Sequence, residues 1–105
     1  MEITKPQNTL KGTGTLLLID DEKPVLDITS TMLESIGFTT LKAASGLQGL
    51  QIYEREKDRI DLVILDMIMP DMSGGEVFDR LREINPRVMV LLASGYSIDG
   101  RATDI

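Results

Sequence analysis

Four residues that could do chemistry each follow an apolar segment of the sequence. Asp20 and Asp21 follow the first such segment, Asp66 follows the third and Ser94 the fourth. Carboxylates held close together repel one another, and one of them takes up a proton unless a cation lies between them. Because Mg²⁺ prefers oxygen ligands and commonly uses a few carboxylates together with water, these acids favour a magnesium site.

A magnesium site of this kind could serve phosphoryl transfer, which needs little beyond positioning and charge compensation. A carboxylate can itself accept the phosphoryl group and form an aspartyl phosphate. The sequence contains no cysteine and no histidine, which excludes a thiol nucleophile, a phosphohistidine carrier and an imidazole ligand on this chain. Any chemistry therefore depends on carboxylates, hydroxyls and the backbone.

The elements that would position these residues alternate along the chain. Short apolar segments predict buried strands, and apolar residues at three- and four-residue spacing predict amphipathic helices between them. The predicted strands span 15–19, 38–43, 62–65 and 88–92. The segment 38–43 is the more polar one and is expected at an edge of the sheet. This alternation indicates an α/β fold with a doubly wound parallel sheet and helices on both faces.

Three helices are expected between the strands. Pro24 suits the first turn of the first helix and Gly37 its end, Ser45 caps the second, and Asn85 before a proline ends the third. The apolar faces of the three helices consist of Val25, Ile28, Met32, Ile36, Leu47, Leu50, Tyr53, Val77, Leu81 and Ile84.

A parallel sheet explains how the chemical residues could meet. All strands end at one edge of such a sheet, and ligands bind there at the point where the strand order reverses. A strand order of 2-1-3-4 would bring Asp21 and Asp66 together. Acids also follow strands because loops are polar and Asp starts helices well. That explanation suits a single acid, whereas several acids and Ser94 on one edge favour a site.

The composition excludes several classes of protein. Hydrophobic residues make up 42% and charged residues 27% of the 105 residues, an ordinary globular mixture without a segment long enough for a membrane span. Asp and Glu outnumber Lys and Arg by 17 to 11, which argues against nucleic-acid binding. Gly12 and Gly14 precede the first strand, whereas a nucleotide-binding loop follows one. Residues 1–14 are interpreted as a linker or an expression remnant.

Three segments resemble a known family. Residues 17–22 (LLIDDE), 66–74 (DMIMPDMSG) and 92–95 (LASG) are similar to the receiver domain of two-component response regulators. The resemblance runs from about Thr15 to Ser97, and the segment 66–74 is its most specific part. The stretch from Ser94 to Ser97 also resembles receiver modules of hybrid sensor histidine kinases.

The resemblance implies a role for each chemical residue. Asp66 would be the phosphoacceptor, Asp21 would bind Mg²⁺ directly, and Asp20 would bind it mostly through water. The backbone carbonyl of Ile68 would complete the protein ligands, and Ser94 would be the switch hydroxyl that binds the phosphoryl oxygens. The donor would be a phosphohistidine on a sensor histidine kinase or a histidine phosphotransfer protein in the cytoplasm. The domain would catalyse its own phosphorylation and its own dephosphorylation.

Other conspicuous residues near Asp66 have structural explanations. Gly74 is expected to shape the loop, and Met67, Met69 and Met72 to pack rather than to bind copper. Asp71 is interpreted as a charge on the rim of the site.

The sequence departs from the family at its C-terminal end. The family continues after the switch residue through a further helix, a fifth strand that ends in Lys-Pro and a last helix, whereas this sequence ends at Ile105. No lysine follows Lys57, so the family's phosphate-binding lysine has no counterpart. We therefore expect a flavodoxin-like sheet of order 2-1-3-4-5 without its fifth strand and last helix, in a C-terminally incomplete domain over 15–105. Its fourth strand would be an exposed edge that allows self-association.

Two other functions are weighed against the phosphoacceptor. A receiver fold without the lysine could be a docking module that is never phosphorylated. A phosphohydrolase that forms an aspartyl phosphate would carry a second acid two residues after the nucleophile, but Ile68 stands there. The sequence favours a phosphoacceptor that signals by shifting a two-state equilibrium around Ser94.

Overall fold

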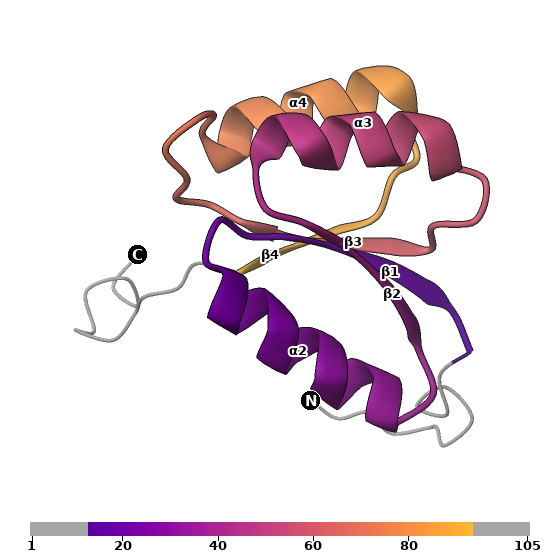
Figure 1. Ribbon diagram of the computed structural model, residues 1–105. Coiled ribbons are helices and arrows are strands. Elements are labelled where there is room, and N and C mark those ends of the chain that lie inside the picture. The colour runs from indigo at the N-terminus through magenta and orange to yellow at the C-terminus, as the bar shows by residue number, and fades with distance from the viewer. Residues whose placement is uncertain (1–12, 94–105) are drawn as a thin grey trace.

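Strands and helices alternate along the chain, as the apolar pattern predicts (Figure 1). The structure, a computed structural model, describes residues 13–93. In chain order its elements are β1 (Thr15–Ile19), α2 (Lys23–Ser35), β2 (Thr39–Ala43), α3 (Gly46–Glu56), β3 (Leu62–Asp66), α4 (Gly74–Ile84) and β4 (Val90–Ala93). None of the helices in this part of the chain is long and apolar enough to cross a membrane.

The strands form one parallel sheet in the order β2-β1-β3-β4. This confirms the predicted order and the edge position of the polar second strand. Strand β4 begins two residues later than predicted. The reason is a turn, because the N–H of Val88 donates to the carbonyl of Asn85 at 3.0 Å and so belongs to the connection after α4.

Helices cover both faces of the sheet, with α3 and α4 on one face and α2 on the other (Figure 1). Successive side chains of a strand point to opposite faces, so each strand contributes to two cores. The larger core, on the α3 and α4 face, includes the fully buried Leu17, Ile19, Tyr53, Val63, Leu65, Val77 and Leu81. The smaller core, on the α2 face, contains Leu16, Leu18 and Leu26.

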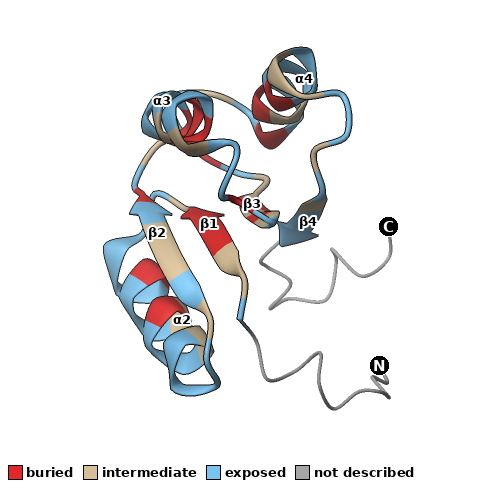
Figure 2. Cartoon of the chain, turned by 90° about the vertical axis from the view of Figure 1, so that its right-hand side faces the viewer, coloured by how far each residue is buried: buried red, intermediate tan, exposed pale blue. Residues whose placement is uncertain are grey.

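Helix α2 meets the sheet with a different side from the predicted one (Figure 2). Leu26 and Ser30 are buried, whereas the predicted apolar face is 40% to 61% exposed: Val25, Ile28, Met32 and Ile36. The buried Ser30 hydroxyl shares a 2.7 Å hydrogen bond with the hydroxyl of Thr40 on β2, which makes a polar residue acceptable there. Periodicity therefore identified the helix but not its inward side. In α3, Leu47 is likewise 54% exposed, while Leu50 and Tyr53 are buried as predicted.

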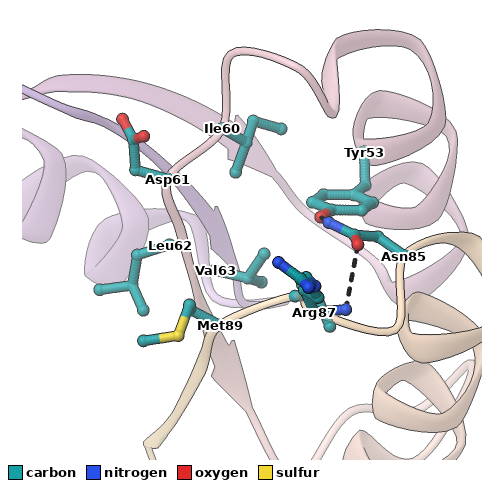
Figure 3. A pocket seen from close by; sticks show the side chains of 9 residues that line it. Tyr53, Ile60, Asp61, Leu62, Val63, Asn85, Arg87 and Met89 are labelled. Carbon is teal, nitrogen blue, oxygen red and sulfur yellow. Dashed lines mark hydrogen bonds between the residues drawn. The ribbon is translucent and has the colours of Figure 1, made fainter.

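The amino end of the sheet, where the strands begin, is held by paired polar groups. The side-chain amide of Asn85, which ends α4 as predicted, donates to the hydroxyl of Tyr53 on α3 at 2.9 Å. Figure 3 shows Asn85 beside the ring of Tyr53, and its dashed line marks a second bond, from the backbone N–H of Arg87 to the Oδ1 of Asn85 at 3.0 Å. A carboxylate oxygen of Asp61 accepts the backbone N–H of Thr15 at 2.8 Å. These bonds tie α4 to α3 and β1 to the segment before β3.

Candidate functional site

Three acids meet at the carboxyl end of the sheet, where the strands end. One carboxylate oxygen each from Asp20, Asp21 and Asp66 lies within 4.8 Å of the other two. The register explains the meeting, because Ile19 of β1 pairs with Leu65 of β3 and the next residue of each strand is an acid. The predicted convergence of residues far apart in the sequence is confirmed.

Each acid is held differently by the backbone. The Oδ1 atom of Asp20 accepts the N–H of Glu22 at 2.9 Å, and the N–H of Asp20 donates to the carbonyl of Ala43 at 3.1 Å. The Oδ1 atom of Asp66 accepts the N–H of Ile68 at 3.2 Å. Asp21 is exposed, while Asp20 and Asp66 are half-buried. Asp21 is therefore the acid most open to an incoming ligand.

Burial raises the pKa of Asp66 from 3.8 to about 6. The N–H of Ile68 opposes this rise, and the negative charges of Asp20 and Asp21 add to it. Asp66 also borders a cavity of about 150 Å³ on the α2 side of the sheet, and most of the other side chains that line this cavity are apolar. A charge in such surroundings is poorly solvated, so the neutral form of the carboxyl is favoured over the ionised form.

The loop after Asp66 is closed on itself. The N–H of Gly74 donates to the carbonyl of Met67 at 3.1 Å. A Cβ at position 74 would lie 2.6 Å from the Cα of Met67 and 3.1 Å from the carbonyl oxygen of Asp66. Only glycine permits this close approach of two backbone segments. Its predicted role in shaping the loop is confirmed, and Met69 is buried as predicted for a packing residue.

Asp71 has a role that sequence reasoning missed. It was expected to be a rim charge, but its carboxylate accepts the backbone N–H groups of Gly46 at 3.1 Å and Leu47 at 3.2 Å. These hydrogen bonds lower the pKa of Asp71. The partners are about 25 positions away in the sequence, and no periodic pattern signals such a contact.

Ser94 and the rest of the segment to Ser97 lie outside the described residues, as do positions 1–12 of the predicted linker. The last described residue, Ala93, pairs with Asp66 in the sheet.

The acid cluster fits a divalent cation with a preference for oxygen. Within residues 13–93 it is the one group of three or more metal-ligating side chains that could hold an ion. Among the described residues no cationic side chain contributes to the shifted pKa of Asp66, and a bound cation would relieve the mutual repulsion of the three carboxylates. Relief of that repulsion would keep Asp66 ionised and therefore nucleophilic.

Comparison with known proteins decides the family. The sequence pattern of the response regulator receiver domain matches residues 16–104, most of the chain. The chain belongs to the response regulator receiver domain family. The receiver domain acts in two-component signalling, and the strand order described above is that of its solved relatives.

Individual relatives place the receiver domain in different molecular contexts. This chain is 35% identical over 96 residues to the sensor kinase CckA of Brucella abortus. The match covers 91% of this chain but 10% of the kinase. A solved receiver domain from Clostridium thermocellum superposes with a TM-score of 0.77 at 34% identity, over 80% of this chain and 67% of that one. The response regulator TrrA of Thermotoga maritima, solved in complex with Mg²⁺-BeF, gives a TM-score of 0.72 at 29% identity, over 81% of this chain and 72% of that one. Magnesium use is therefore consistent with the family.

Proposed function

We propose that this receiver domain accepts a phosphoryl group on Asp66, with Mg²⁺ held by Asp20, Asp21 and Asp66. The observation that carries the proposal is the approach of the three carboxylates to within 4.8 Å of one another. Mg²⁺, when bound, supplies charge compensation for the acids and for the transferred group.

The geometry supports a different role for each ligand. Asp21 is exposed and is proposed to bind the ion directly. The Oδ1 atom of Asp20 already accepts the N–H of Glu22, which favours contact through water. The carbonyl of Ile68 is proposed as the remaining protein ligand, since its own N–H is fixed to Asp66 at 3.2 Å.

In the proposed reaction an oxygen of Asp66 attacks phosphorus. The P–O bond to Asp66 forms while the bond from phosphorus to the donor breaks. With a phosphohistidine donor, the imidazole leaves with the electron pair of the P–N bond and takes up a proton from solvent. Positioning and charge compensation are what this step requires of the protein.

Ser94 is proposed as the hydroxyl that binds the phosphoryl oxygens and shifts the domain between two states. Its neighbour Ala93 is the register partner of Asp66, which supports the assignment. We also propose a receiver domain over 15–105 after a linker over 1–14.

The proposed donor partner is a sensor histidine kinase or a histidine phosphotransfer protein in the cytoplasm. A hybrid kinase is one parent protein that would fit, given the similarity to the CckA sensor kinase. Self-association through β4 is a further proposal, because among the described residues β4 pairs on one side only, with β3.

The test is incubation of the chain with acetyl phosphate and Mg²⁺, followed by intact mass spectrometry. We expect a phosphoryl adduct that hydroxylamine removes and that Asp66→Asn abolishes. Asp61→Asn, at the opposite end of the sheet, is the matched control and should retain the adduct. No adduct on the unmodified chain would overturn the proposal and support a docking module.

A further inference from the structure

The hydrogen bonds of Asp71 join the loop after Asp66 to a helix that begins elsewhere in the chain. Its Oδ1 accepts the N–H of Gly46 at 3.1 Å and its Oδ2 the N–H of Leu47 at 3.2 Å. Both donors lie in the first turn of α3, whose leading N–H groups have no partner within the helix. Asp71 therefore provides a helix cap from a distant part of the sequence.

Two capping residues divide the start of α3 between them. The hydroxyl of Ser45 accepts the N–H of Gln48 at 3.0 Å, and the N–H of Gly49 donates to the carbonyl of Ser45, also at 3.0 Å. Asp71 takes the two remaining donors, those of Gly46 and Leu47. A local serine and a remote aspartate thus make the same kind of contact with the same helix.

Two further contacts fix the loop after Asp66, one beside Asp71 and one at the end of the loop. Met72 follows Asp71 and packs so close to Gly46 that a Cβ there would lie 3.1 Å from the Cβ of Met72. At the far end of the loop, Gly74 donates to the carbonyl of Met67. Ile68 lies between these two attachments, and its N–H reaches the Oδ1 of Asp66 at 3.2 Å.

The charge of Asp71 interacts with the start of α3 and not with the acid cluster. A negative group at a helix N-terminus is stabilised by the helix dipole, and the two backbone N–H groups hold the pKa of Asp71 below its usual value. Asp66, at the end of β3 just before this loop, has a raised pKa. Two acids five positions apart therefore have opposite surroundings, which suits one for structure and the other for reaction.

We infer that Asp71 is a positioning residue that holds the backbone of Ile68 in place beside Asp66 by anchoring the loop to the start of α3. This inference rests on the proposed function, since the carbonyl of Ile68 is proposed there as a metal ligand. Outer contacts that orient a ligand commonly change metal affinity by about tenfold or more.

The test compares Asp71→Ala with Ser45→Ala, two variants that each remove a cap from the same helix. In metal-free protein, amide hydrogen exchange of Ile68 should become at least about fivefold faster in Asp71→Ala and change less than about twofold in Ser45→Ala. In a titration followed by amide chemical shifts, the Kd for Mg²⁺ should rise about tenfold in Asp71→Ala alone.

A third variant separates hydrogen bonding from charge. Asp71→Asn loses the charge but keeps one acceptor oxygen, so its exchange rate and Kd should lie between those of the parent chain and Asp71→Ala. It also serves if Asp71→Ala fails to fold. Equal effects of Asp71→Ala and Ser45→Ala would overturn the inference, because Asp71 would then act through helix stability only. If Asp71→Asn raised the Kd for Mg²⁺ as far as Asp71→Ala while the exchange of Ile68 stayed at the parent rate, the inference would be overturned, because the lost charge and not the position of the loop would then weaken binding.

The outcomes keep this inference apart from the proposed function. If the parent chain binds Mg²⁺ and accepts phosphoryl groups while Asp71→Ala behaves like it, only the inference fails. If the parent chain does neither, the proposed function fails, and the exchange of Ile68 still reports whether Asp71 holds the loop.

Discussion

The polar groups at the two ends of the sheet differ in whether they are paired. At the amino end, the carboxylate of Asp61 accepts the N–H of Thr15, and Asn85 and Tyr53 form a neutral hydrogen bond. At the carboxyl end, Asp20, Asp21 and Asp66 lie close together, and within residues 13–93 none of the groups that shift the pKa of Asp66 is a cationic side chain. The polar groups at the amino end stabilise the fold, whereas the crowding of the three acids at the carboxyl end destabilises it.

This difference locates the part of the molecule where polar side chains lower the stability of the fold. A paired polar group contributes modestly to folding, whereas crowded carboxylates raise the free energy of the folded state until a cation or a proton arrives. Strongly shifted ionisable groups in a cleft are a signature of functional sites. The proposed function assigns the reaction to the carboxyl end, so substitutions at the two ends should separate activity from stability.

Among variants that keep Asp66, the largest effect is expected for Asp21→Ala, which removes the exposed ligand of the proposed ion. The rate of phosphorylation by acetyl phosphate at fixed Mg²⁺ should fall about a hundredfold, as is typical when a metal ligand is lost. Asp61→Asn, which keeps an acceptor oxygen for Thr15, should change the rate less than about twofold. A similar loss in both variants would show that the two ends are not functionally distinct.

Gly74→Ala should reduce stability by about 2 kcal/mol, because a methyl group cannot fit 2.6 Å from the Cα of Met67 and the backbone must move. Gly75→Ala is the matched control, since the nearest atom to its new methyl group is the Ser73 oxygen at 4.0 Å. Urea unfolding at equilibrium gives both values. A loss of stability in Gly75→Ala as large as that in Gly74→Ala would contradict the close approach of the loop to Asp66.

Asp66→Asn should stabilise the metal-free protein by about 1.5 kcal/mol near pH 7, after allowance for solvent screening of this half-buried carboxyl. Because the folded pKa of Asp66 is raised to about 6 from 3.8, its protonation favours the folded state. That contribution is fully present below the unfolded pKa and is lost as the pH rises through the folded value.

The gain from Asp66→Asn should therefore disappear near pH 3, below the unfolded pKa of 3.8, where the native residue is protonated in both states. It should also shrink when Mg²⁺ is added near pH 7, since a bound cation stabilises the ionised native residue alone. Urea unfolding in EDTA at both pH values measures the effect. A gain of equal size at both pH values would show that charge is not its cause.

Tyr53→Phe should produce the smallest effect, a loss of about 1 kcal/mol with unchanged phosphorylation. The variant removes the acceptor of the 2.9 Å hydrogen bond from Asn85 and leaves the ring in place. Thermal unfolding and the acetyl phosphate assay on the same sample provide both readouts. A slower phosphorylation would mean that the amino end influences the reactive end.

Much of the fold and of the site could be predicted from local pattern. Apolar segments located all the strands in the described residues, with β4 displaced by the turn at Asn85. The positions of the acids after β1 and β3 predicted their meeting, because parallel strands end together. The inward side of α2 could not be predicted, since both of its sides carry apolar residues and the buried Ser30 is acceptable only through Thr40.

The sequence by itself determined the order of the elements and the identity of the acids, because both depend on residue types and short spacings. The tertiary structure alone decided how strongly burial and neighbouring charges raise the pKa of Asp66. It also decided that Asp71 caps α3, a contact between backbone donors and a side chain from another loop. Hydrogen-bond partners and solvation depend on which groups pack nearby in space. Short-range spacing along the chain does not predict contacts between residues that are far apart in the sequence.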